Sequence, residues 1–221
     1  MDAVQRHLSP DSRSGFEAVV RDPCRVRHFI DEAVPREDVE HMVDLAMCAA
    51  STCAAQTWRF VAVSDPRLVA RMRNAVLGRF EQLALTPGLA LQEHKRTAAR
   101  AQALSFAKAP LCVAVVALPS SSPIEELMEL AGMTQEERDR LCVRPELQSA
   151  GAAVQLLTTS AHSLGYATCW TCAPIVAVER LEEILEVEPP SRLVALVAVG
   201  RSAEQPVASR RWPLEQALTF R

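Results

Sequence analysis

The pattern of apolar and polar positions predicts three strands separated by helices. The largely apolar segments 109–119 and 192–200 predict two buried strands. The stretch WRFVAV at 58–63 predicts a third strand because it combines aromatic and β-branched residues. Strands that alternate with helices in this way indicate a mixed α/β domain.

Residues that favour helix ends indicate where the helices start and stop. Pro35 is expected in the first turn of the first long helix. Ser64 or Asp65 is expected to cap a second helix, with Pro66 in its first turn. Gly165 is expected to end a later helix in the left-handed conformation.

The remaining polar segments predict loops and one larger excursion. Residues 9–15 and 165–174 are interpreted as loops, and 120–145 as a lid or other excursion from the core. We therefore expect an N-terminal segment at 1–18 and a single domain at 19–221.

Small residues dominate two stretches of the sequence. Residues 49–55 contain no large side chain, and residues 149–153 make the first half of a predicted helix thin. At residues 49–55, a close contact between helices would favour small residues, and so would a wall that admits a flat aromatic ring. In the second case Ser51 and Thr52 would add hydroxyl groups and backbone N–H donors.

Composition narrows the class of protein. The 221 residues are 49% hydrophobic and carry a net charge of −3, which disfavours nucleic acid as the main partner. The longest apolar runs are shorter than the roughly 20 residues of a membrane helix. No signal-peptide pattern is seen at the N-terminus. We therefore expect a cytoplasmic protein without a membrane partner.

No side-chain motif points to a catalytic residue or to a metal site. The five His residues lack paired ligand spacing, and neither a G-x-S-x-G motif nor a phosphate-binding glycine loop is present. The pair Cys169 and Cys172 lies after a late helix, where a redox dithiol is not expected, and small pocket-lining residues are the simpler interpretation. If the protein is an enzyme, a cofactor carries the chemistry.

Arginines near both ends of the chain are candidates for binding a phosphate. Arg21, Arg25 and Arg27 precede the first long helix, and an arginine pair occurs at 210–211. Their planar guanidinium groups suit phosphate oxygens. Solvated basic surface loops would have the same composition, so neither cluster alone is decisive.

Five motifs in order give the chain a resemblance to the nitroreductase-like family of FMN-dependent oxidoreductases. The motifs are PCRVRHF, AVPREDVEHMVDLAMCAAS, AASTCAAQTWRF, GAAVQLLTTSAHSLGYATCW, and LVALVAVG followed by RWPLE. The resemblance runs from about Val19 to the end of the chain. It implies an α+β fold with a mixed sheet flanked by helices. It also implies an intertwined homodimer with FMN at the interface and an extended C-terminal arm that embraces the other subunit.

The resemblance also implies roles for individual residues. The flavin phosphate would be held by Arg25, Val26 and Arg27 and by Arg211. Ser51, Thr52 and Cys53 would place their backbone against one face of the isoalloxazine ring. The N5 and O4 side of the ring would be met by Trp170, Thr171 and Cys172.

Several positions depart from the family pattern. Pro23 replaces the first phosphate-binding Arg, and Ala54 replaces an Asn on the flavin or substrate side. Ala50 and Thr57 replace two prolines of the same motif. The basic residue near flavin N1 has four candidates: Arg71, Arg73, Arg79 and Lys95.

The expected activity is ping-pong transfer of hydride from NAD(P)H through FMN to a small electron-poor acceptor, a nitroaromatic, quinone or enone. No protein side chain is expected to act as the catalytic group. Three alternatives remain open: a flavin-destructase or dehalogenase-like enzyme, a non-enzymatic flavin sensor or storage protein, and a thiol-redox module built on Cys169 and Cys172.

Overall fold

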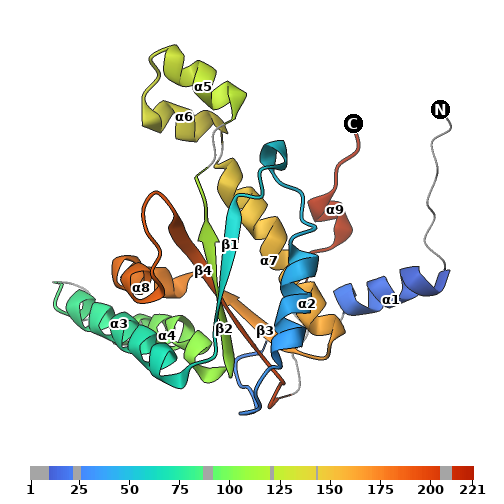
Figure 1. Ribbon diagram of the computed structural model, residues 1–221, viewed down its shortest axis with the longest axis vertical. Coiled ribbons are helices and arrows are strands. Elements are labelled where there is room, and N and C mark those ends of the chain that lie inside the picture. The colour runs from blue at the N-terminus through green and yellow to red at the C-terminus, as the bar shows by residue number, and fades with distance from the viewer. Residues whose placement is uncertain (1–9, 22–25, 87–91, 120–121, 143, 205–210) are drawn as a thin grey trace.

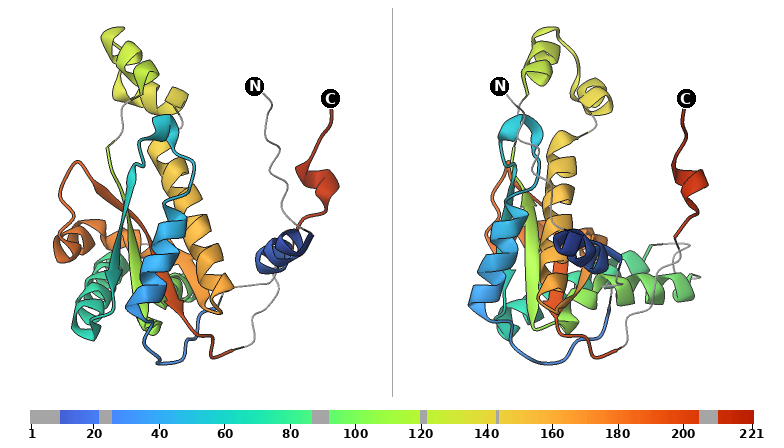
Figure 2. Two further views of the ribbon diagram at one scale, coloured as in Figure 1. Left: turned by 45° about the vertical axis from the view of Figure 1, so that its right-hand side comes forward. Right: turned by 90° about the vertical axis from the view of Figure 1, so that its right-hand side faces the viewer.

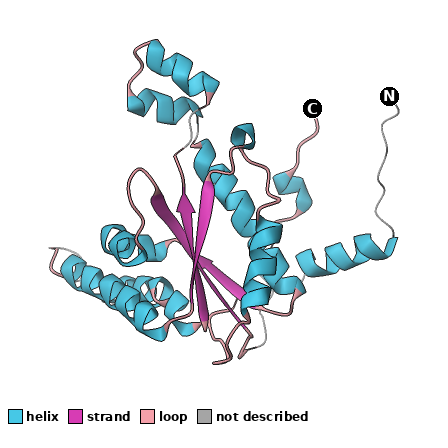
Figure 3. Cartoon of the chain, viewed as in Figure 1, coloured by secondary structure: helices cyan, strands magenta, loops and turns pink. Residues whose placement is uncertain are grey.

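A four-stranded sheet lies at the centre of the protein, with helices on both of its faces (Figure 1, Figure 3). The computed structural model describes residues 10–21, 26–86, 92–119, 122–142, 144–204 and 211–221. The strands are β1 (Trp58–Val63), β2 (Leu111–Ala117), β3 (Ala167–Thr171) and β4 (Arg192–Gly200). The α-helices are α1 (Pro10–Arg21), α2 (Arg36–Ala46), α3 (Pro66–Ala84), α4 (Glu93–Ala103), α5 (Pro123–Leu130), α6 (Gln135–Cys142), α7 (Pro145–Ser163), α8 (Val178–Leu185) and α9 (Leu214–Ala217). The described residues also form the 3₁₀ helices η1 (Thr52–Ala54), η2 (Ser105–Lys108) and η3 (Ala173–Ala177).

All strand pairs within the described residues are antiparallel. The order is β1-β2-β4-β3, and each neighbouring pair runs in opposite directions. The expected mixed sheet is therefore wrong for this part of the chain. The reason lies in the connections: α3 and α4 return the chain to the end of the sheet at which β1 stops, because Val63 pairs with Cys112 at the start of β2.

Strand β2 is buried along its whole length, as its sequence predicts. Leu111, Val113 and Val115 pack with α2 and α7, whereas Cys112, Ala114 and Val116 pack with α3 and α8. This alternation follows from the two-residue period of a strand. Burial raises the pKa of the Cys112 thiol to about 12 and keeps it protonated. The sheet therefore separates two apolar cores.

The predicted helix ends are confirmed to within a residue. Asp65 caps α3, since its carboxylate accepts a hydrogen bond from the Arg67 N–H at 2.9 Å. Gly165 follows α7 with a φ of +80°. Pro35 occupies the N-cap position of α2 and lies just before the first turn.

Two predicted loops are wrong because they contain regular structure. Most of residues 9–15 belong to α1, which begins at Pro10 and has Asp11 in its first turn. The segment 165–174 contains β3, which pairs with β4 from Ala167 to Thr171. Its neighbour in the sheet gives this short segment its strand conformation, which local sequence signals did not predict.

Gly200 ends β4 at a point where no side chain fits. A Cβ atom added there would lie 2.7 Å from Pro110 Cδ and 3.2 Å from Phe29 Cδ1. We expect Gly200→Ala to lower the free energy of unfolding by about 1–3 kcal/mol, because the prolyl ring has little room to move. Urea unfolding would measure the loss. Gly78→Ala in α3 is the control, since an added Cβ there meets nothing within 4 Å. Equal stability of the Gly200 variant and wild type would contradict this packing.

Candidate functional site

A cavity opens where β3 stops short of its neighbour. β3 has five residues and β4 has nine, and Thr171 at the end of β3 pairs with Leu196. The first four residues of β4, 192–195, therefore have no β3 partner. Beside them lies a cavity of about 730 Å³. Small-molecule sites typically measure about 300–1,000 Å³, so this one could hold an organic cofactor or substrate.

The thin first half of α7 forms one wall of the cavity. Ala150, Gly151 and Val154 line it, and a Cβ added at Gly151 would lie 3.9 Å from the Trp170 ring. Trp170 also lines the cavity and is 43% exposed. Small residues on the helix thus leave open space in front of an aromatic ring.

The end of β3 meets the cavity through one exposed side chain. Trp170 is exposed, whereas its neighbours Cys169 and Thr171 are buried. Cys172, just after the strand, is exposed and lines the cavity. Of the three predicted ring contacts on this segment, Trp170 and Cys172 therefore reach the cavity with their side chains. Thr171 does not: its Oγ1 accepts a hydrogen bond from the Ala173 N–H at 3.3 Å.

The two thiols of the C-x-x-C pair lie in different environments. Cys169 is buried, with its Sγ 3.7 Å from Ser105 Oγ, while Cys172 faces the cavity. Both are free thiols in this structure. The interpretation of both thiols as small residues at a pocket wall therefore fits Cys172 and is wrong for Cys169, which does not line the cavity.

Helices α5 and α6 form the opposite wall and project beyond the end of the sheet (Figure 1). They contribute Glu125, Gln135, Asp139 and Cys142 to the lining. The Glu125 carboxylate accepts a hydrogen bond from the Ser122 N–H and completes a capping box at the start of α5. These helices fall within the segment 120–145 that the sequence predicts as a lid.

Arg144 joins this pair of helices to α7. Its Nε donates to the Glu146 carboxylate at 2.7 Å, and its Nη1 lies 3.6 Å from the Asp139 carboxylate. Its backbone has a φ of +51°, which is rare for a residue with a side chain. A single arginine at a sharp change of direction thus links two walls of the cavity.

The predicted ring-binding stretch 51–53 has an unusual backbone. Cys53, Ala54 and Gln56 have φ values of 53°, 55° and 47°, and none is a glycine. Such conformations cost free energy, of order 1–3 kcal/mol each, and cluster at functional sites. Ser51 stabilises the turn, because its Oγ accepts a hydrogen bond from the Gln56 N–H at 3.0 Å.

This turn and Trp170 lie on different sides of α7. Thr52 N–H donates to Ser149 Oγ at 3.2 Å, whereas Gly151 faces Trp170. Two positions along a helix correspond to a rotation of about 200°, so these contacts point nearly opposite ways. Within one chain the structure therefore does not bring the stretch 51–53 to the cavity that Trp170 lines.

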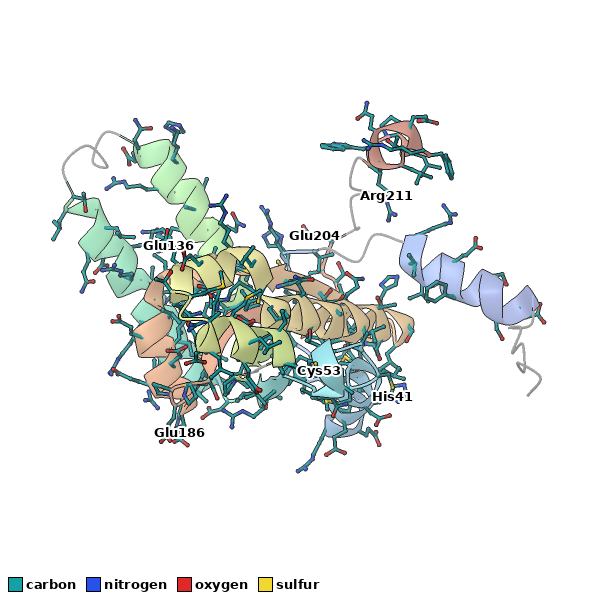
Figure 4. All side chains as sticks on the ribbon, turned by 90° about the horizontal axis from the view of Figure 1, so that it is seen from above. His41, Cys53, Glu136, Glu186, Glu204 and Arg211 are labelled. Atoms are coloured by element: carbon teal, nitrogen blue, oxygen red, sulfur yellow. The ribbon has the colours of Figure 1, made fainter. Side chains whose placement is uncertain are left out.

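The predicted phosphate ligands that the structure describes, Val26, Arg27 and Arg211, do not line the cavity. Arg25 falls outside the described residues. Val26 is buried, with its N–H 3.4 Å from the Thr168 carbonyl oxygen, and Arg27 is exposed. Arg211 lies at the base of the C-terminal segment, well away from Cys53 (Figure 4). Its Nη2 lies 3.5 Å from the Val20 carbonyl oxygen, near the end of α1, from which the arginine segment continues.

The charged residues that line the cavity were not predicted from the sequence. The four candidates for a basic residue near flavin N1 lie on α3 and α4 and do not line it. Arg144 and Arg192 do line it. Arg192 begins a predicted strand, but no periodic pattern distinguishes it from an ordinary polar end. Arg144 precedes Pro145 in a polar segment, and its position next to a proline that begins a helix was the available signal.

Neither a metal site nor a membrane span is found among the described residues. No three His, Cys, Asp or Glu residues there gather closely enough to hold a metal ion. In the same part of the chain, no helix has the length and apolar character needed to cross a bilayer.

Comparison with known families gives a match over most of the chain. The model of the nitroreductase family matches residues 25–201. Among curated proteins, an iodotyrosine deiodinase from Haliscomenobacter hydrossis is 44% identical over 50 residues. That stretch covers 23% of this chain and only 22% of the relative.

Solved structures share the fold to different extents. A BluB-like flavoprotein from Clostridium difficile 630 has a TM-score of 0.85 and 26% identity, over 92% of this chain and 97% of that one. An NADPH:FMN oxidoreductase from Vibrio harveyi has a TM-score of 0.67 and 12% identity, over 93% of this chain and 76% of that one. The NfrA1 nitroreductase from Bacillus subtilis has a TM-score of 0.66 and 18% identity, with 93% and 73% covered.

Proposed function

Because the chain belongs to the nitroreductase family, we propose that it is an FMN-dependent oxidoreductase that uses NAD(P)H to reduce a small electron-poor acceptor. The observation that carries the proposal is the cavity of about 730 Å³ between the thin start of α7 and the exposed Trp170. Nitroaromatics, quinones and enones are the acceptor classes we expect.

The residues present fit a flavin. The wall at Ala150 and Gly151 has no bulky side chain, so a flat ring can approach the helix closely. Trp170 offers an aromatic surface of the kind on which planar rings stack. The arginines at 25, 27 and 211 supply guanidinium groups suited to the phosphate.

A complete site would be shared between two subunits. Within one chain, α7 lies between the strained turn at 51–53 and the cavity beside Trp170. A single ring can contact both only if they come from different copies of the chain. We therefore infer a homodimer in which Ser51, Thr52 and Cys53 of one subunit complete the pocket that Trp170 and Cys172 of the other subunit line.

Positioning and exclusion of water are the expected tasks of the protein. The bound FMN would supply the hydride-transfer chemistry, from NAD(P)H to the acceptor in alternate half-reactions. Backbone N–H groups beside the ring would stabilise negative charge, as preorganised donors do in other enzymes. The Arg144 contacts hold the α5 and α6 wall in place and so limit access of water. No side chain has to donate or accept a proton.

An absorption spectrum followed by anaerobic titration tests the proposal. We expect the purified protein to show flavin absorption, either as isolated or after FMN is added. NADH or NADPH should bleach that absorption, and a quinone added afterwards should restore it. A protein that remains colourless after addition of FMN would contradict the assignment.

A second candidate is a flavin enzyme with different chemistry, such as a destructase or a reductive dehalogenase. The BluB-like flavoprotein has the highest TM-score of the three structures above, and the match covers 97% of its chain. The relative matched over only 50 residues is a deiodinase. Halide release from a halogenated phenol, with little NAD(P)H oxidation by simple quinones, would favour this candidate.

A further inference from the structure

The segment that carries the predicted phosphate-binding residue Arg27 is paired with the chain that leaves β4. Ile30 N–H donates to the Arg201 carbonyl at 2.9 Å, and Ala203 N–H donates to the His28 carbonyl at 3.0 Å. Phe29 and Ser202 form an antiparallel bridge between these hydrogen bonds. The position of the arginine segment thus depends on residues just beyond the sheet.

One carboxylate from those residues fixes the arginine segment directly. Glu204 Oε1 accepts hydrogen bonds from the N–H groups of Arg27, at 2.9 Å, and His28, at 3.3 Å. Its second oxygen, Oε2, lies 2.9 Å from His28 Nδ1. Figure 4 shows Glu204 between the body of the protein and the C-terminal arm.

Glu204 is itself held by a tight turn. Its N–H donates to Ser202 Oγ at 3.1 Å, and the Ser202 hydroxyl donates to the Glu204 carbonyl oxygen. This turn aims the side chain back at residues 27 and 28. The hydrogen bond from Arg27 N–H, followed by that from His28, lowers the pKa of Glu204, so the carboxylate is ionised at neutral pH.

A negative charge at this place would by itself oppose phosphate binding. It also occupies two backbone N–H groups that would otherwise be available to a phosphate. The exposed Arg27 guanidinium makes no side-chain hydrogen bond or ion pair with the described residues, so it is the part of this segment that remains available. Any favourable effect of Glu204 on phosphate binding must therefore come from how it positions the neighbouring backbone and not from its charge.

We propose that Glu204 is a positioning residue for the flavin phosphate: it holds the backbone of Arg27 and His28 and thereby restricts where the Arg27 guanidinium can lie. This inference rests on the proposed function, because it takes the bound group to be FMN. It assigns to a carboxylate outside the predicted site an effect on one part of the ligand only.

The test compares FMN with riboflavin, which lacks the phosphate. In Glu204→Ala we expect the Kd for FMN to rise about tenfold, as for loss of hydrogen bonds to a charged group, while the Kd for riboflavin stays within about twofold. Glu204→Gln, which keeps the size and one acceptor, should show a smaller rise. Quenching of flavin fluorescence measures both affinities.

Glu40→Ala is the matched control, because Glu40 is an exposed carboxylate paired with Arg36 on α2. It should leave both affinities unchanged. Tighter or unchanged FMN binding in Glu204→Ala would overturn the inference, and so would an equal loss for FMN and riboflavin. If wild type binds neither flavin, the proposed function itself fails.

A double-mutant cycle separates positioning from an independent contribution. If Glu204 acts through Arg27, the variant Arg27→Ala/Glu204→Ala should bind FMN about as weakly as Arg27→Ala alone. If the double variant instead raises the Kd for FMN by the product of the two single-variant factors, Glu204 contributes without Arg27 and the proposal is overturned.

Discussion

Replacement of Gly151 by leucine is expected to abolish flavin-dependent activity while the protein stays folded. Gly151 lies on the wall of α7 that lines the cavity, and an added Cβ there meets only the Trp170 ring, at 3.9 Å. The remaining three carbons of leucine would occupy the space in which the flavin or the acceptor is proposed to lie. Leucine is a good helix former, so α7 itself should tolerate it.

The expected loss is large because a flat ligand cannot move away from a blocked wall without losing its other contacts. Turnover of NAD(P)H with a quinone should fall about 100-fold or more, the size of effect known for misplaced reactants. Flavin content of the purified protein, measured by absorption, separates loss of the cofactor from loss of the acceptor site. Circular dichroism would confirm that the helices remain.

Alanine at the same position is the matched control. Its single methyl group fits, and the change from glycine to alanine inside a helix stabilises by about 1 kcal/mol. Gly151→Ala should therefore keep its activity and unfold at a slightly higher urea concentration. Full activity in Gly151→Leu would show that the reaction takes place elsewhere.

Local sequence signals were sufficient for the elements that are specified by their own residues. The run at 111–118 is apolar throughout, and β2 is buried on both faces. Asp65 followed by Pro66 predicts the start of α3, and the carboxylate forms the expected cap. Each of these features depends on residues within one or two turns of the chain.

Features that depend on distant partners were not predictable in the same way. The short strand β3 has a mixed polar sequence, and its pairing with β4 places it in the sheet. The antiparallel direction of every described strand pair follows from how the helices return the chain to the sheet. A pattern in a single segment contains no information about either.

In the candidate site, too, some features were predictable from the sequence and others depend on distant partners. Family motifs pointed to the nitroreductase family, and the family match confirms it. Trp170 and Cys172 were predicted to lie beside the flavin ring, and both line the cavity together with small residues of α7 that were not predicted to do so. That α7 separates this cavity from residues 51–53 follows only from the packed structure. Arg144 and Glu204 are charged residues in polar segments, so no periodic signal could identify them.

The C-terminal arm, residues 212–221, carries apolar side chains that the described residues of its own chain leave exposed. Trp212, Leu214, Leu218 and Phe220 are 77%, 67%, 45% and 88% exposed. The arm extends away from the body of the protein beside α1, which itself contacts α7 (Figure 2). Full burial of a large apolar side chain typically stabilises by about 1.5–3 kcal/mol relative to its exposure to water. Burial of these four side chains against a second copy of the chain would therefore stabilise a dimer.

Removal of residues 212–221 is therefore expected to convert a dimer into a monomer. The truncated chain keeps Arg211, so any loss of FMN would reflect loss of the partner and not of a phosphate ligand. We expect wild type to elute as a dimer at micromolar concentration in size-exclusion chromatography with light scattering. The truncated form should elute as a monomer and bind FMN at least about tenfold more weakly, because one subunit presents only part of the ring contacts.

Single charge substitutions refine the test without shortening the chain. Phe220→Glu should weaken the dimer, because it places a charge where an apolar group is expected to be buried. Leu85→Glu is the control, since Leu85 is 84% exposed at the end of α3, far along the chain from the arm. Equal dimer stability in both variants would mean that the arm does not form the interface. A wild-type monomer that binds FMN tightly would show that one chain can enclose the ring without the stretch 51–53 of a partner.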